Sequence, residues 1–147
     1  MDWKKESTQK LLAYTSKLNA TLTLPDEIKR LESRYTSIRS ARTDATPVSG
    51  GGSTREDDLL TNIVKRGELE RRLREEKLWI ATVDKALSVL GSDDRKILDM
   101  LLIHPQKGAI SRVCDEFNLE DESSVYRRRT RALRKFTLAY YGATETL

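Results

Sequence analysis

Apolar residues along this chain recur every three or four positions, which is the spacing of one face of an α-helix. Together with the positions of proline and glycine, the repeat predicts N-terminal helices over residues 2–19, 26–41 and 56–90. The stretch TLTLPD should form the turn between the first two helices. Pro25 then suits the first turn of the second helix, where its missing N–H is tolerated. Helical signals dominate throughout, so we expect an all-α fold.

The apolar repeat of the third expected helix is too long to be covered by one small domain. Leucine, isoleucine and valine recur at heptad spacing from 69 to 90, interrupted only at Glu76. A helix of roughly 35 residues spans about 50 Å at ~1.5 Å per residue. We therefore expect residues 1–90 to form a long arm, either a helical hairpin within one chain or a coiled coil that joins two copies.

A polar, glycine-rich segment separates the second and third expected helices. Residues 43–55 read TDATPVSGGGSTR and contain almost nothing that could be buried. Such a composition is typical of flexible chain. We interpret the segment as a flexible connector between two antiparallel helices.

The C-terminal third of the chain predicts three shorter helices separated by turns. They should cover about 93–102, 109–117 and a last helix that begins near Ser123, after Gly91 has ended the arm. Asn118 lies where the chain must reverse and tolerates a left-handed backbone. Asp121 or Ser123 can cap the last helix. This order predicts a helix-turn-helix domain over residues 91–142.

Positive charge is concentrated in the last of these helices. The chain has 147 residues and a formal net charge of +4, yet residues 123–136 alone carry six cations and no acid. The remainder of the chain, at +4 less +6, is therefore net −2. Basicity that is focused in one helix favours a polyanionic partner such as double-stranded DNA.

Other kinds of chemistry find little support in the composition. Cys114 is the only cysteine and His104 the only histidine, which argues against an intrachain disulfide, a zinc site and a Cys–His nucleophile. The acidic pairs lie at expected helix starts, where they serve as caps and dipole partners. We therefore expect no catalytic residue, metal or cofactor, and no enzyme. Without an apolar run of membrane-spanning length or a signal core, a cytoplasmic protein with no membrane partner is expected.

The C-terminal sequence resembles region 4 of bacterial sigma factors over about residues 84–141. The resemblance rests on Ala86-Leu87 through Ile97-Leu98, on Val113-Cys114, and on Ser124-Val125 followed by Ala132-Leu133-Arg134-Lys135-Phe136. Cys114 replaces the usual alanine, and Asn118 replaces the usual turn glycine. The small size and the ending ALRKFTLAYYG also look like the ArpU and RinA regulators of phages and prophages of Gram-positive bacteria. This likeness implies a sigma-like helix-turn-helix that activates phage late genes for packaging or lysis.

The residues of the arginine-rich helix that face away from its apolar stripe are the expected DNA contacts. Arginine is the usual bidentate partner of guanine, whereas serine hydroxyls bind phosphates or bases alike. Arg129 lies nearest the stripe and is expected to be a partly buried structural residue. The expected contacts are Ser123, Ser124, Arg127, Arg128 and Arg131 on the groove side, Tyr126 at its border, and Arg134 and Lys135 at the phosphate backbone.

Two other functions share these sequence features. A phage small terminase subunit also combines a helix-turn-helix with helical oligomerisation elements, and it would bind packaging-site DNA as a ring of many copies. A protein-interaction module would instead use the arginines to contact an acidic partner such as host RNA polymerase. A regulator would be a monomer or a homodimer joined through the long helix, so its mass in solution separates it from a ring.

Overall fold

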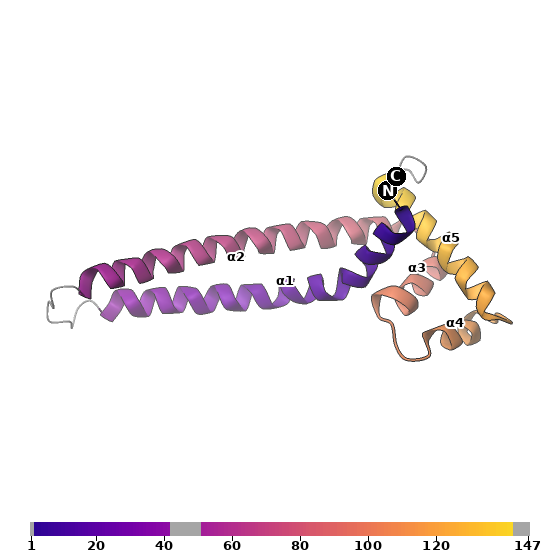
Figure 1. Ribbon diagram of the computed structural model, residues 1–147, viewed down its shortest axis with the longest axis horizontal. Coiled ribbons are helices and arrows are strands. Elements are labelled where there is room, and N and C mark those ends of the chain that lie inside the picture. The colour runs from indigo at the N-terminus through magenta and orange to yellow at the C-terminus, as the bar shows by residue number, and fades with distance from the viewer. Residues whose placement is uncertain (1, 42–50, 143–147) are drawn as a thin grey trace. The chain divides into compact units, whose positions relative to one another are not determined.

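The computed structural model describes residues 2–41 and 51–142, and these ranges contain helices and no strand (Figure 1). The expectation of an all-α fold is therefore confirmed. The elements are α1 (Trp3–Ser40), α2 (Gly51–Ser88), α3 (Ser92–Leu98), the π-helical segment η2 (Asp99–Ile103), α4 (Ala109–Phe117) and α5 (Glu122–Tyr141).

The N-terminal part of the chain forms one long helix where two were expected. α1 continues through Pro25, so the predicted break between 19 and 26 is wrong. Proline in a helix interior costs about 3 kcal/mol, because it removes an N–H and its ring crowds the preceding turn. Leu24, Ile28 and Leu31 lie on one face across the proline, and all three are buried. At ~1.5–3 kcal/mol for each buried aliphatic side chain, this packing outweighs the cost of the proline.

α2 begins earlier than the apolar repeat indicated. Its first residue is Gly51, whereas the helix was expected from 56. Residues 43–50 of the expected connector lie outside the described residues, and residues 51–55 are helical. Arg55 donates from Nη2 to the carbonyl oxygen of Arg39 at 3.0 Å. This contact joins the beginning of α2 to the end of α1 within the hairpin unit.

The chain divides into two compact units, which we describe separately. The terminal unit comprises residues 1–17 and 79–147, and the hairpin unit comprises residues 18–78. The predicted division differs, because it placed all of residues 1–90 in the arm. The first turns of α1 and the last turns of α2 belong with α3, α4 and α5 because their apolar side chains share one core. Leu11 and Val83 are completely buried in the same cluster as Phe136.

The core of the terminal unit gathers side chains from segments that are far apart in the sequence. The larger of its two clusters contains Leu11, Val83, Ala86, Leu90, Leu98, Leu102, Ile103, Ala132, Leu133 and Phe136. Ser7 of α1 and Thr137 of α5 are also fully buried, and their hydroxyl oxygens are 2.6 Å apart in a hydrogen bond. Because each buried hydroxyl has a partner, the pair fixes α1 against α5 without an unpaired polar group.

A smaller cluster holds α4 and the beginning of α5 against α3. Ile97, Val113 and Val125 are buried in it, and Cys114 is partly buried at its edge. Asn118 ends α4 with φ 53 and ψ 47, the left-handed conformation that the sequence predicted. Of the two predicted caps of α5, Asp121 is the one used, and its carboxylate accepts from the backbone N–H of Ser124. The turn between α4 and α5 therefore follows the sequence prediction.

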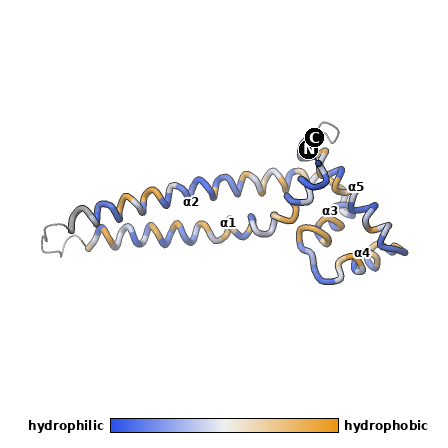
Figure 2. The backbone as a smooth tube through the Cα atoms, in the orientation of Figure 1, coloured by the Kyte–Doolittle hydropathy of each residue, from blue (hydrophilic) through white to orange (hydrophobic). Residues whose placement is uncertain are grey.

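The hairpin unit consists of residues 18–41 and 51–78, in which α1 and α2 run antiparallel beside each other (Figure 1). Apolar and hydrophilic residues are interspersed along both helices (Figure 2). Asn62 is buried between them and donates from Nδ2 to the carbonyl oxygen of Leu31 at 2.8 Å, while its Oδ1 has no partner. Arg66, one turn later, lies over the ring of Tyr35 at 5.0 Å. The interface of this unit is thus narrow and partly polar.

Candidate nucleic-acid interface

α5 presents a row of three arginines to solvent, which we call the arginine row. Arg127, Arg131 and Arg134 are exposed and follow one another in steps of four and three residues, so they lie on one side of the helix. The opposite side of α5 is buried in both clusters of the terminal unit. At ~1.5 Å per residue, the row extends for about 10.5 Å along the helix axis. The core therefore holds a short line of guanidinium groups on a rigid element.

Two neighbouring cations of α5 are engaged by other helices. Lys135 donates from Nζ to Oδ2 of Asp94 in α3 at 2.6 Å. The guanidinium carbon of Arg128 lies 5.7 Å from the ring centroid of Phe117 in α4, and Arg128 is half-buried. Asp94 offsets the charge of Lys135, and the aromatic ring restricts Arg128. Both residues were expected to contact DNA, and each is held by a contact with a neighbouring helix.

The first turn of α5 is organised by a short chain of hydrogen bonds. Oδ1 of Asp121 accepts from the backbone N–H of Ser124 at 2.9 Å and from its Oγ at 2.7 Å. Nη2 of Arg127 donates to the same Oγ at 3.0 Å. The side-chain hydrogen bond from Ser124, followed by the backbone one, lowers the pKa of Asp121, and the charge of Arg127 acts in the same direction. The Ser124 hydroxyl therefore orients Arg127 and is already occupied.

The remaining expected contacts differ in their surroundings. Ser123 is exposed in the first turn, and Tyr126 is 49% exposed beside the arginine row. Arg129 is half-buried, in keeping with the structural role predicted for it. The structure thus brings Ser123, Arg127, Arg131 and Arg134 to the outward side of α5, and it places Tyr126 and Arg128 on its flanks.

Charge reverses sign along α5. Glu120, Asp121 and Glu122 precede or begin the helix, where carboxylates interact favourably with its positive end. Positive charge then starts one turn later and continues for about two turns. A polyanion that approached this helix would meet repulsion at its beginning and attraction from Arg127 onward. The surface can therefore orient a charged partner as well as attract it.

The guanidinium groups of the arginine row can bind an anion. Guanidinium groups offer a planar fork of donors that matches a phosphate or the acceptor edge of guanine. Within the described part of the chain, no group of three or more His, Cys, Asp or Glu residues could hold a metal ion. The same residues contain no helix that is both long enough and sufficiently apolar to cross a membrane.

Two contacts that join α5 to distant residues have no signal in the sequence pattern. The pairing of Lys135 with Asp94 joins positions 41 residues apart. Lys10 of α1 lies over two rings at the end of α5, with Nζ 5.0 Å from the centroid of Tyr140 and 5.5 Å from that of Tyr141. Periodicity within one segment carries no signal for either contact, because both depend on how the helices pack.

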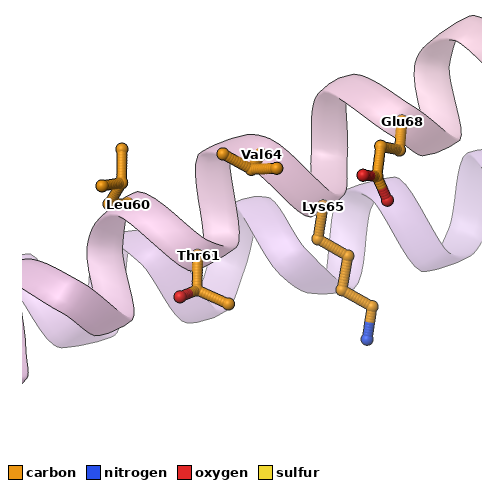
Figure 3. Close-up of a pocket in the computed structure, with 5 residues that line it drawn as sticks. All are labelled: Leu60, Thr61, Val64, Lys65 and Glu68. Carbon is orange, nitrogen blue, oxygen red and sulfur yellow. The ribbon is translucent and has the colours of Figure 1, made fainter.

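A hollow on α2 in the hairpin unit is the main alternative site (Figure 3). It is lined by Leu60, Thr61, Val64, Lys65 and Glu68, which all belong to a single helix. Leu60 and Val64 are 60% and 53% exposed, so the hollow encloses little. Small-molecule sites are concave and bury most of their ligand. This surface lacks that enclosure, and α5 remains the better candidate.

Comparison of the chain with protein-family models, with curated proteins and with solved structures gives no match.

Proposed function

We propose that this protein is a sequence-specific DNA-binding transcriptional regulator and that α5 is the helix that enters the major groove. The arginine row carries this proposal. The row begins within the first two turns of α5, and the N-terminal residues of a recognition helix are the ones that contact base edges. Arginine at these positions can donate to O6 and N7 of guanine.

The chain of contacts around α4 and α5 supports the same assignment. The turn at Asn118 and the buried Val113 and Val125 hold the two helices in a fixed relation. Arg127 is positioned by Ser124, which lowers the entropy lost when it binds a base. Glu122 at the start of α5 is exposed, and a carboxylate there can accept from the amino group of cytosine. We assign base contacts to Arg127 and Arg131, and a phosphate contact to Arg134.

The biological role that we propose is control of phage or prophage genes, most specifically late genes for packaging or lysis. It rests on the sigma region-4 resemblance of residues 84–141 and on the likeness to the ArpU and RinA regulators. Within residues 84–141, α4 and α5 are joined by the turn at Asn118.

The first experiment measures binding of the full chain to duplex DNA over a range of salt concentrations. Each neutralised phosphate contributes about −0.9 to the slope of log K against log salt, so the phosphate contact assigned to Arg134 predicts a slope of about −1. Light scattering on the same sample gives the mass, and a large ring would favour the small-terminase alternative. The absence of salt-sensitive binding to DNA from upstream of phage late genes would contradict the proposal.

A further inference from the structure

The basic surface of the terminal unit extends beyond the arginine row, because Lys10 of α1 lies at the C-terminal end of α5. Lys10 belongs to the first turns of α1 and is separated from Arg134 by more than a hundred residues of sequence. Its Nζ is 5.5 Å from the ring centroid of Tyr141, the last residue of α5. The two helix segments lie side by side here (Figure 1).

The position of Lys10 is fixed by buried contacts. Ser7 and Thr137 are both 0% exposed and share a 2.6 Å hydrogen bond, which joins α1 to α5. One turn further along each helix, Lys10 meets Tyr140 and Tyr141. A lysine ammonium over two aromatic rings loses freedom but keeps its charge. Lys10 is therefore an ordered cation, unlike a lysine on a free surface.

Helix geometry places Tyr141, one of the two rings that Lys10 contacts, on the side of the arginine row, whereas Tyr140 lies about 100° further round the helix. Arg127, Arg134 and Tyr141 are seven residues apart, so they lie on nearly the same side of α5. At ~1.5 Å per residue, Tyr141 lies about 21 Å from Arg127 along the helix axis. In recognition helices the N-terminal residues contact base edges, and the C-terminal end can contact the phosphate backbone. If the row lies in the groove, the end of α5 is therefore placed to meet the phosphate backbone.

We propose that Lys10 is a further DNA contact, which binds a backbone phosphate at the edge of the groove occupied by α5. This inference rests on the proposed function and adds α1 to the DNA-binding surface. Tyr140 and Tyr141 act as positioning residues that hold the ammonium in place. Lys10 contributes to affinity equally on all sequences, since phosphates carry no base identity.

The test compares Lys10→Gln with Lys17→Gln on a mixed-sequence DNA duplex. Lys17 is a matched control: it lies on the same helix and places its Nζ 5.0 Å from a ring centroid, but that ring is Trp79 of α2. Lys10→Gln should reduce the magnitude of the salt slope by about 1, and Lys17→Gln should leave it unchanged. Lys10→Arg should restore the slope, and thermal melts should show that all three variants are folded.

The two ways in which the test can fail are distinguishable. If the wild-type chain binds DNA with a salt-dependent affinity and Lys10→Gln has the same slope, the role of Lys10 is contradicted while the proposed function stands. If the wild-type chain shows no salt-dependent binding, the proposed function is contradicted and the role of Lys10 with it. A Lys17→Gln variant that loses as much slope as Lys10→Gln also contradicts the assignment, because it shows a general effect of charge.

Discussion

The terminal unit and the hairpin unit are built from the same two long helices, yet they bury their side chains very differently. In the terminal unit, Leu11, Val83, Leu98 and Phe136 are completely buried, because five helical elements surround one core. In the hairpin unit, two helices share a narrow interface whose best-buried residues include the polar Asn62. A helix pair can cover only one stripe of each partner, whereas a helix packed among several others can bury more of its surface. The contrast explains why the arginine row of α5 lies on a firmly packed helix.

The first prediction compares the loss of stability when a large core side chain is truncated in each unit. Phe136→Ala should destabilise the terminal unit by about 3–5 kcal/mol, because it leaves a large cavity in a core that several helices enclose. Ile28→Ala in the hairpin unit should cost less, near ~2 kcal/mol, since Ile28 is 8% exposed and its site can relax. Denaturant unfolding followed by circular dichroism measures both. Equal losses would show that the two units do not differ in packing as described.

The second prediction compares the effect on DNA affinity of removing an exposed arginine from each unit. Arg131→Ala should weaken binding to a specific DNA site by ~1–3 kcal/mol, because it removes a base contact, and should leave stability nearly unchanged. Arg74→Ala is the matched control, since Arg74 is an exposed arginine on a long helix of the hairpin unit. Fluorescence anisotropy with labelled duplex gives both affinities. A larger loss from the Arg74 variant would move the binding surface away from α5.

The third prediction concerns the polar residue in the hairpin interface. Asn62→Leu should stabilise the hairpin unit by ~1 kcal/mol, because the Oδ1 of Asn62 is buried without a partner. Its hydrogen bond to the Leu31 carbonyl is lost, but a buried asparagine of this kind serves mainly to fix register. Thermal unfolding measures the change. A decrease in stability would mean that the hydrogen bond outweighs the unpaired oxygen.

The fourth and smallest prediction is a dependence on alkaline pH that arises from Tyr14 in the terminal unit. Burial raises the pKa of Tyr14 from 10.0 to about 12, with further contributions from its 2.6 Å hydrogen bond to Asp84 and from that carboxylate's charge. Because the folded state favours the neutral phenol, this stabilisation is complete below about pH 10 and is lost as pH rises through about 12. Tyr14→Phe should therefore show a smaller fall in Tm between about pH 9.5 and 11.5. An identical fall in both proteins would contradict the assignment.

Much of the terminal unit's local structure could be predicted, because it depends on short-range rules. The left-handed Asn118, the Asp121 cap and the exposure of Arg127 and Arg131 all follow from residue type and helical spacing. The continuity of α1 could not be predicted from the sequence. The rule that proline ends a helix considers only neighbouring residues, whereas the burial of Leu24 and Ile28 on either side of Pro25 depends on packing against other parts of the chain.

The residues of the candidate site could be predicted from the sequence, but their contacts with other helices could not. Spacing placed Arg127, Arg131 and Arg134 on the outer side of α5. It gave no sign that Asp94 pairs with Lys135 or that Lys10 lies at the end of the helix. Those contacts join segments that become neighbours only when the core forms.

The most direct test of the account is an NMR titration of the full chain with duplex DNA, which follows the arginine side-chain signals. If α5 binds DNA, the signals of Arg127, Arg131 and Arg134 should shift on binding, while those of Arg71 and Arg74 in the hairpin unit should not. Shifts confined to the hairpin unit, with the signals of α5 unchanged, would contradict the claim that α5 is the DNA-binding helix.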